Sequence, residues 1–313
     1  MAGETGLPQA FVERLRQIVD DADFDTTLAS FSRTSQTAFR VNTLKTGVAE
    51  ALDELDVEAR PLPWYSEGFV ADIRYREALT LSPAFGEGRI YIQNPASMLA
   101  PLLLDPQPGE EVLDLAAAPG GKTLMMAAMM QNRGRIAAVE PVKGRFFRLR
   151  NNLDTFGASV VDTYLKDGRE VGWKVPERFD RVLLDAPCSS ESRFDANDPA
   201  SFSHWNERKV KEVQRKQKKL ICSALAALKP GGVLLYSTCS YSPEENELVV
   251  QHALKKFDGR VSIEPAAMRL DNFRPGLAQW KGKTLDPRLG ECVRVLPDDT
   301  MHGFFLCRLR KQA

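Results

Sequence analysis

From Glu111 onward, short apolar runs alternate with helical patterns, and this alternation constrains the fold more than any other feature of the chain. Repeated strand and helix units of this kind build a parallel sheet, because each helix returns the chain to the same edge. The predicted strands are residues 112–116, 135–140, 160–166, 179–184 and 232–238. The predicted helices are residues 123–130, 142–156, 206–228 and 243–257. We therefore expect an α/β fold built on a parallel sheet.

The two ends of the chain add different units to this sheet. Residues 291–296 and 303–310 are two further β-like runs, close enough in sequence to pair as a terminal antiparallel hairpin. The first part of the chain has a helical pattern at 8–31, the β-like stretch TAFRVNT, the helical stretch GVAEALDEL and the β-rich stretch RPLPWYSEGFVAD. We expect a small α+β domain over residues 1–88 and the parallel sheet over residues 89–313.

Composition narrows the class of protein. Because 42 basic residues balance 42 acidic ones, any nucleic-acid surface must be a local patch. The longest apolar runs, such as residues 124–130, are far shorter than the ~20 residues that a bilayer requires. The N-terminus has no signal-peptide pattern, so we expect a cytoplasmic protein without a membrane partner. The five cysteines form no CxxC, which favours reduced thiols over disulfides or a metal site.

The stretch DLAAAPGGKT, residues 114–123, joins the first predicted strand of the sheet to a helix. Ligands bind at this edge of a parallel sheet, where glycines let the backbone approach closely. A phosphate-binding P-loop needs glycine where Ala116 stands, and the dinucleotide pattern GxGxxG is absent here. S-adenosylmethionine is the remaining common ligand of this architecture. The alternative is a turn that only packs a helix on a strand.

Acidic residues end the next three predicted strands. We expect Glu140 to accept hydrogen bonds from ribose hydroxyls, as the ribose-binding acid does in dinucleotide folds. We expect Asp167 to accept from an adenine amino group and Asp185 to face the reactive end of the cofactor. Any one of these acids alone is more simply a solvated loop residue or a helix cap. Three at successive strand ends favour a cofactor site.

Two cysteines follow the fourth and fifth strands of this sheet, Cys188 in DAPCSS and Cys239 in YSTCSYSPEENE. A buried cysteine is usually a small core residue. However, Ser242 and Glu245 predict a capping box with Pro243 at the first helical position, which places Cys239 just before a helix N-terminus. The partial positive charge there lowers the pKa of a thiol and favours the thiolate.

A thiolate beside a methyl donor indicates methylation of carbon 5 of a pyrimidine. Carbon 5 is too weakly nucleophilic to take a methyl group until a thiolate adds to carbon 6. Carbon 5 then attacks the sulfonium methyl. A base removes the carbon 5 proton, and the thiolate leaves. Enzymes that methylate an exocyclic amine usually carry an aromatic residue where Cys188 stands. The residues by themselves do not rank the two thiols.

The chain resembles the Sun-type RNA (cytosine-5)-methyltransferases, which include bacterial rRNA enzymes and archaeal and eukaryotic tRNA and rRNA enzymes. The motifs that carry the resemblance are FRVNTLK, YIQNPASM, DLAAAPGGKT, DAPCSS, YSTCSYSPEENE and GFFLCRLRK. The resemblance implies a Rossmann-like S-adenosylmethionine-dependent methyltransferase sheet, with Cys239 as nucleophile, Cys188 assisting product release and Asp185 near the reacting base. The cofactor-binding residues that it implies are Ala116, Ala117, Ala118, Pro119, Gly120, Gly121, Lys122, Glu140, Arg145, Asp167 and Asp185.

The chain departs from this family after Cys188. Most bacterial members continue Ser-Gly-x-Gly, whereas Ser190 and Ser192 stand at the glycine positions here. The loop on the substrate side is therefore expected to differ.

RNA, as rRNA or tRNA, is the expected partner, and a protein that presents the RNA is a second candidate partner. Basic residues crowd the starts of two predicted helices: Lys143, Arg145, Arg148 and Arg150, and Arg208, Lys209, Lys211, Arg215, Lys216, Lys218 and Lys219. We expect the domain over residues 1–88 to bind RNA as well, with Arg40 and Asn42 as candidates for contacts with the RNA backbone. The alternative for each basic cluster is a solvated helix face. The target cytosine must be unpaired or flipped out to reach Cys239.

Two other functions compete with this interpretation. An amine-directed methyltransferase on the same fold would not need Cys239. A catalytically impaired RNA-binding assembly factor would keep the cofactor pocket without turnover, and the altered loop after Cys188 makes it conceivable. Trapping of a covalent adduct between thiol and RNA separates the leading hypothesis from both alternatives.

Overall fold

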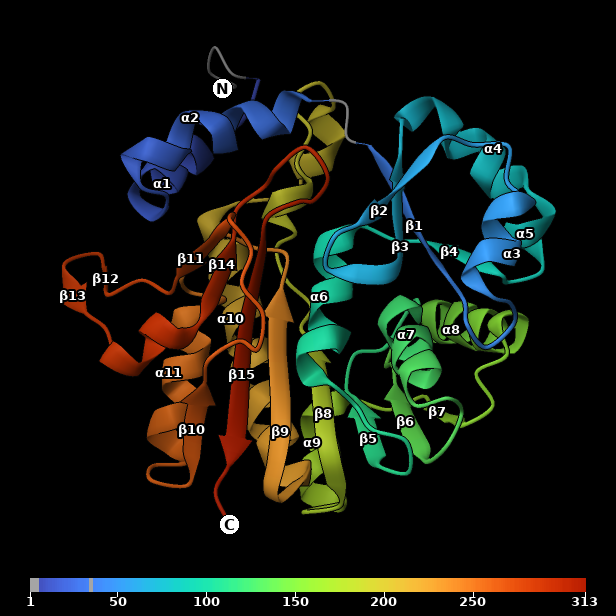
Figure 1. Ribbon diagram of the computed structural model, residues 1–313. Helices are drawn as coiled ribbons and strands as arrows, with labels where there is room; N and C mark the ends of the chain where they lie inside the picture. The colour runs from blue at the N-terminus through green and yellow to red at the C-terminus, as the bar shows by residue number, and fades with distance from the viewer. Residues whose placement is uncertain (1–5, 34–35) are drawn as a thin grey trace.

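The computed structural model describes residues 6–33 and 36–313, which form a large sheet flanked by helices and a smaller sheet beside it (Figure 1). The parallel strands of the large sheet are β5 (Glu111–Asp114), β6 (Arg135–Val139), β7 (Val161–Tyr164), β8 (Phe179–Asp185) and β9 (Leu228–Thr238). They lie in the order β9-β8-β5-β6-β7. The predicted α/β fold class is thus confirmed. The chain reverses direction across the sheet between β5 and β8, and ligands bind at such a switch point.

The helices cover both faces of the large sheet. Leu99, Leu124 and Leu149 pack one face, and Ile221 and Val249 pack the other. The helices of the first face are α6 (Pro95–Leu104), α7 (Gly121–Met129) and α8 (Lys143–Phe156). Those of the second face are α9 (Gly168–Lys174), α10 (Glu207–Ala227) and α11 (Glu247–Lys256). Both cores bury aliphatic side chains from the strands between them.

The C-terminal residues complete the large sheet. β14 (Val293–Val295) pairs antiparallel with β15 (Phe304–Lys311), as predicted, and β15 pairs antiparallel with β9. β10 (Val261–Glu264) pairs with β15, and β11 (Phe273–Pro275) pairs with β14. β12 (Gln279–Trp280) and β13 (Lys283–Thr284) form a small separate ribbon. The antiparallel strands extend the sheet beyond β9 and cover its edge.

The smaller sheet has the order β2-β3-β1-β4. Its strands are β1 (Thr37–Val41), β2 (Ala59–Leu62), β3 (Tyr65–Ala71) and β4 (Ile90–Ile92), and its helices are α3 (Val48–Asp53), α4 (Arg76–Leu81) and α5 (Pro83–Gly86). Because β4 follows Gly88 and pairs with β1, this sheet continues past the expected boundary. The division of the chain at 88 remains a prediction.

The N-terminal helical stretch differs from the expectation in two ways. It is two helices, α1 (Gln9–Ile18) and α2 (Asp21–Ala29), because Val19 and Asp20 have extended backbone. These helices lie apart from the smaller sheet (Figure 1). The Phe11 ring instead packs against Phe194, with ring centroids 4.9 Å apart, and against Trp205 at 5.6 Å. Helix α1 therefore packs its apolar side chains into the hydrophobic core on one face of the large sheet.

Arg40 and Asn42 do not contact solvent and so are not available to RNA. Both are buried, at 0% and 2% exposure. The Arg40 guanidinium donates to Gly121 O at 3.1 Å, and the Asn42 amide donates to Phe156 O at 2.8 Å. They join the smaller sheet to the large one, which corrects their expected role as backbone contacts. In the described part of the chain, no helix is long and apolar enough to cross a membrane.

Candidate active site

The glycine loop between β5 and α7 needs both of its glycines. Gly120 precedes the helix with φ +112°, a conformation that favours glycine. A Cβ on Gly121 would lie 2.8 Å from the Tyr91 ring. Thr123 on the first turn of α7 donates to the Asp114 carboxylate at 2.7 Å. These contacts hold the loop over the end of β5.

A cavity of about 660 Å³ opens at this edge of the sheet, and we call it the glycine-loop cavity. Its walls include Ala116, Ala117, Ala118, Pro119, Gly121 and Lys122, that is, every predicted loop residue except Gly120. Arg145, Asp185, Cys188 and Cys239 also line it. The tertiary structure thus brings both thiols and most of the predicted cofactor residues to one space.

Asp185, at the end of β8, is held in the wall of this cavity. Its carboxylate forms an ion pair with Lys122 Nζ at 2.7 Å. It also accepts a hydrogen bond from Ser237 Oγ at 2.9 Å. The carboxylate therefore has a fixed orientation between the loop and the two cysteines.

The Cys188 and Cys239 sulfur atoms lie 3.2 Å apart. A hydrogen bond from Cys188 and the positive charge of Arg193 lower the pKa of Cys239, against the effects of burial and of the Asp185 charge. The same hydrogen bond, together with burial, raises the pKa of Cys188 well above its usual value. The pKa of Cys239 thus lies below that of Cys188, which favours Cys239 over Cys188 as the thiolate of the pair.

The predicted capping box after Cys239 does not form. Helix α11 begins at Glu247, with Asn246 before it, rather than at residue 243. The Ser242 hydroxyl instead donates to Glu191 at 2.6 Å, and the Glu245 carboxylate accepts from Ser189 N at 2.9 Å. Distant partners compete successfully for both side chains. The N-cap residue of α11 is instead Asn246, which is hydrogen-bonded to Thr238 and Ser240 on either side of Cys239.

Glu140 and Arg145 lie together beside the glycine loop. Glu140 is 1% exposed, and its carboxylate accepts from Val142 N at 2.9 Å. Arg145 lies 3.6 Å from the other Glu140 oxygen and donates to Ala118 O at 2.6 Å. Arg145 lines the glycine-loop cavity, whereas Glu140 is not among its lining residues. Contact between Glu140 and a cofactor remains a prediction.

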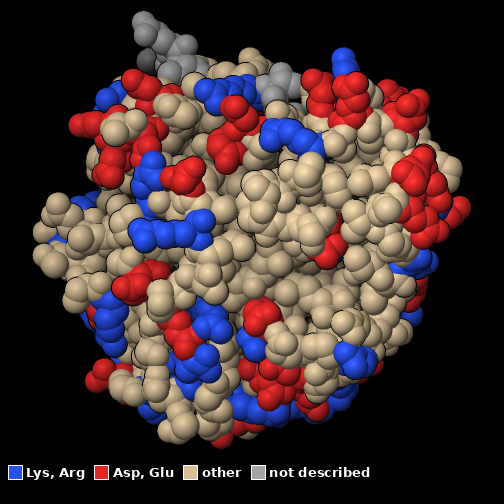
Figure 2. Space-filling view, viewed as in Figure 1, with Lys and Arg blue, Asp and Glu red and all other residues tan. Residues whose placement is uncertain are grey.

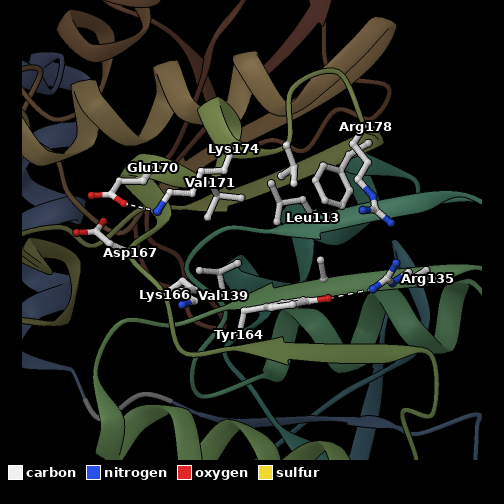
Figure 3. A pocket seen from close by; sticks show the side chains of 13 residues that line it. Leu113, Arg135, Val139, Tyr164, Lys166, Asp167, Glu170, Val171, Lys174 and Arg178 are labelled. Carbon is white, nitrogen blue, oxygen red and sulfur yellow. Dashed lines mark hydrogen bonds and ion pairs between the residues drawn. The ribbon is translucent and has the colours of Figure 1, made fainter.

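Asp167 is not brought to the glycine-loop cavity. It caps α9, and its carboxylate accepts from Arg169 Nε at 2.9 Å, which lowers its pKa. It lies at the edge of a second, apolar cavity of about 310 Å³ on the α9 face of the sheet. In Figure 3 its carboxylate points away from lining residues such as Leu113 and Val139. Contact between Asp167 and a cofactor remains a prediction.

Sequence reasoning missed two charged residues of the glycine-loop cavity, Asp114 and Arg193. Asp114 ends β5, so the rule applied to the later strands would have identified it. Its Oδ1 atom is buried without a hydrogen-bond partner among the described residues. Burial raises its pKa to about 6. An acceptor that lacks a donor at a cavity wall fits a ligand with a cationic amino group, as S-adenosylmethionine has.

The basic residues of α10 are mostly exposed, with Lys209 and Lys216 both near Glu212. Acidic side chains instead gather at the upper right of Figure 2, over the region of α3 to α5. A broad area of the surface in the middle of that view carries few charged side chains. On the face drawn in Figure 2, the region of α3 to α5 is mainly acidic, which does not favour contact with a polyanion there. An RNA-binding role for residues 1–88 stays a prediction.

Comparison with known proteins identifies relatives over nearly the whole chain. Residues 101–310 match the family model of the 16S rRNA methyltransferase RsmB/F, and residues 7–95 match that of the N-terminal domain of 16S rRNA methyltransferase RsmF. Ribosomal RNA small subunit methyltransferase F of Serratia proteamaculans is 38% identical over 97% of this chain. The chain spans only 63% of the length of that relative.

Two archaeal proteins match over almost their full length. The tRNA (cytosine(49)-C(5))-methyltransferase of Pyrococcus abyssi is 38% identical, and the match covers 96% of this chain and 95% of that one. The solved structure of a methyltransferase homolog protein from Pyrococcus horikoshii has a TM-score of 0.84 at 35% identity, covering 98% of this chain and 96% of that one. The arrangement of both sheets is thus shared with a solved relative.

Proposed function

This chain belongs to the RsmB/F family of 16S rRNA methyltransferases, and from that premise we propose that it methylates carbon 5 of a cytosine in rRNA or tRNA, with S-adenosylmethionine as methyl donor. The observation that carries the proposal is the pair of sulfur atoms 3.2 Å apart in the wall of the glycine-loop cavity. An amine-directed enzyme has no need of two adjacent thiols at this position. The names of relatives that act on rRNA and on a tRNA cytosine support the class of substrate.

The residues around the cavity fit the proposed cofactor. The glycine loop would hold it, Asp114 would accept from its amino group, and Glu140 would accept from its ribose once Arg145 moves aside. When bound, S-adenosylmethionine supplies an electrophilic methyl group on a sulfonium centre. Lys122 is ion-paired with Asp185 and would hold that carboxylate in place beside the reacting base.

Cys239 begins the reaction as a thiolate. Its sulfur forms a bond to carbon 6 of the cytosine, and the electron pair of the carbon 5–carbon 6 double bond becomes available at carbon 5, where the methyl group is taken up. A base then removes the carbon 5 proton, the double bond reforms, and the bond between carbon 6 and sulfur breaks. Cys188, which has the higher pKa of the two thiols, is placed to assist this last step.

Methyl transfer to defined RNA tests the proposal. The purified protein is incubated with rRNA and tRNA transcripts and radiolabelled S-adenosylmethionine, and the RNA is digested to nucleosides. We expect the label in 5-methylcytidine. Label in a nucleoside methylated on nitrogen would favour the amine-directed alternative. RNA binding without any labelled nucleoside would favour the assembly factor.

A further inference from the structure

The loop that follows Cys188 is fastened to the loop that carries Cys239. Its Glu191 is 1% exposed, and its carboxylate accepts from the backbone N–H groups of Tyr241 and Ser242, both at 2.8 Å. It also accepts from Ser240 Oγ at 2.9 Å and from Trp205 Nε1 at 2.8 Å. A buried carboxylate with so many donors has a single orientation. The short helix η3 (Glu191–Arg193) is therefore fixed relative to Cys239.

Arg193 lies between two anchored neighbours. On one side, Ser192 N donates to the backbone carbonyl of Cys239 itself at 3.1 Å. On the other, the Phe194 ring is buried, 4.9 Å from the Phe11 ring. The Arg193 side chain lines the glycine-loop cavity and is solvent-exposed there. Within residues 6–33 and 36–313, no carboxylate lies within ion-pair distance of its guanidinium.

The charged or titratable residues that line the cavity with Cys239 include Asp114, Lys122, Arg145, Asp185, Cys188, Arg193 and His302. Glu245 acts on the neighbouring Cys188. Lys122 is already paired with Asp185, whose own charge opposes a thiolate. Burial raises the pKa of Glu245 to about 8, so it is mostly neutral at pH 7. Burial lowers the pKa of His302, so it too is neutral. The other arginine in the cavity wall, Arg145, lies 3.6 Å from Glu140 and donates to Ala118 O. Among the described residues of this wall, Arg193 is thus the cation left without an ionic partner to act on the sulfur.

We propose that Arg193 is a catalytic residue, the positive charge that holds the Cys239 sulfur as a thiolate before it attacks carbon 6. The proposal rests on the function proposed above and names the group that activates its nucleophile. The Ser190 hydroxyl, at a position where the family resemblance predicts glycine, also helps to lower the pKa of Cys239. The altered loop therefore supplies a cation and a hydroxyl to the nucleophile.

The same interaction also affects the pKa of Arg193. The charge of Cys239 is the largest cause of the raised pKa of Arg193, followed by a smaller contrary effect of burial. Because Arg193 is exposed to the cavity, water screens the interaction in the free protein. A bound RNA would exclude that water and strengthen the pair when attack occurs.

The test measures the pH dependence of Cys239 alkylation by iodoacetamide, read by mass spectrometry of the peptide that contains it, without RNA or cofactor. In Arg193→Met we expect the pH at which alkylation of Cys239 is half-maximal, its midpoint, to rise by about 1 pH unit or more, because a nearby opposite charge is lost. Arg193→Lys should restore most of the change. Arg145→Met, which removes a cation from the other end of the same cavity, should leave the midpoint where it is. Arg193→Gln is a second neutral variant if Arg193→Met fails to fold.

An unchanged midpoint in both neutral variants would overturn the role of Arg193, and so would an equal rise in Arg145→Met. Because the measurement needs no methyl transfer, it is independent of the function proposed above. If the midpoint rises but the wild-type protein methylates no RNA, the proposed function fails and the Arg193–Cys239 pair stands. If methylation occurs and the midpoint is unchanged, only the assignment of Arg193 fails.

Discussion

The sulfur atoms of Cys188 and Cys239 lie 3.2 Å apart, although 51 residues separate them in the chain. This contact makes their roles unequal, because it lowers the pKa of Cys239 and raises that of Cys188. It is also the basis of the sharpest prediction from the structure.

Replacing either thiol should give opposite results on a denaturing gel. Cys239→Ala cannot bond to carbon 6 and should form no covalent RNA adduct, while its cofactor binding persists. Cys188→Ala should still attack and transfer the methyl group but release the product slowly, so a nuclease-sensitive, slow-migrating band should accumulate. The double variant should show no band. The reverse pattern would make Cys188 the nucleophile. No band in any variant, even on RNA with 5-fluorocytosine, would contradict covalent catalysis.

The rate of methyl transfer should fall in acid. The pKa of Cys239 is lowered to about 6, so the thiolate predominates above that pH and is lost below it. We expect the single-turnover rate to be level above pH 7 and to drop by about tenfold per unit well below pH 6. RNA and S-adenosylmethionine must both be saturating, because Asp114 also has a pKa of about 6 and would alter cofactor affinity. A rate that stays level down to pH 5 would contradict a titrating Cys239.

Glu140→Ala should weaken S-adenosylmethionine binding, because it removes a buried acceptor for the ribose hydroxyls. The loss should be roughly 1.5–3 kcal/mol, the range for hydrogen bonds to charged groups, or about 10- to 150-fold in affinity. Calorimetry measures it, with Glu170→Ala on the exposed face of α9 as the matched control. ATP and nicotinamide dinucleotides should not bind, because the loop lacks their glycine patterns. Unchanged affinity would remove Glu140 from the site.

The exposed basic face of α10 should contribute phosphate contacts. Replacing Arg215, Lys216 and Lys219 together with Glu should lower RNA affinity and flatten the slope of log affinity against log salt by about 2. Cofactor binding should be unaffected. The control replaces Lys255, Lys256 and Arg260 with Glu, because the C-terminal end of α11 lies at the edge of the sheet away from the cavity. Equal slopes in both triple variants would make α10 an ordinary solvated helix.

A buried ion pair should hold the start of α11 to the C-terminal hairpin. Arg294 Nε and the terminal nitrogen Nη2 both donate to Glu247 at 2.6 Å, and the two side chains are 7% and 0% exposed. Arg294→Ala leaves a buried carboxylate unpaired and should cost about 3–5 kcal/mol of unfolding free energy. Urea unfolding measures it. Arg288→Ala, which breaks the more exposed pair with Asp286, should cost no more than about 1 kcal/mol. Similar costs for both would contradict the importance of burial.

The order of strands and helices could be predicted from the sequence because it rests on local periodicity. Each predicted strand from 112 to 238 corresponds to one of β5 to β9, and the terminal hairpin is present as β14 and β15. The ends of the predicted strands also place Asp185, Cys188 and Cys239 at one edge of the sheet, and the three residues line one cavity there, whereas Asp167 does not. Parallel strands all end at one edge of a sheet, so residues that follow them must gather there.

Only the tertiary structure decided how the nucleophile is activated. Local pattern placed a helix cap at Ser242, but Glu191, 51 residues away in sequence, takes that hydroxyl. Arg193 carried no motif, and it faces Cys239 because Ser192 and Phe194 are anchored to segments distant in sequence. The periodicity of apolar residues in the sequence reflects only interactions between residues a few positions apart in the chain. Hydrogen bonds and charges that cross between loops depend on the packing of the whole chain, which no local pattern contains.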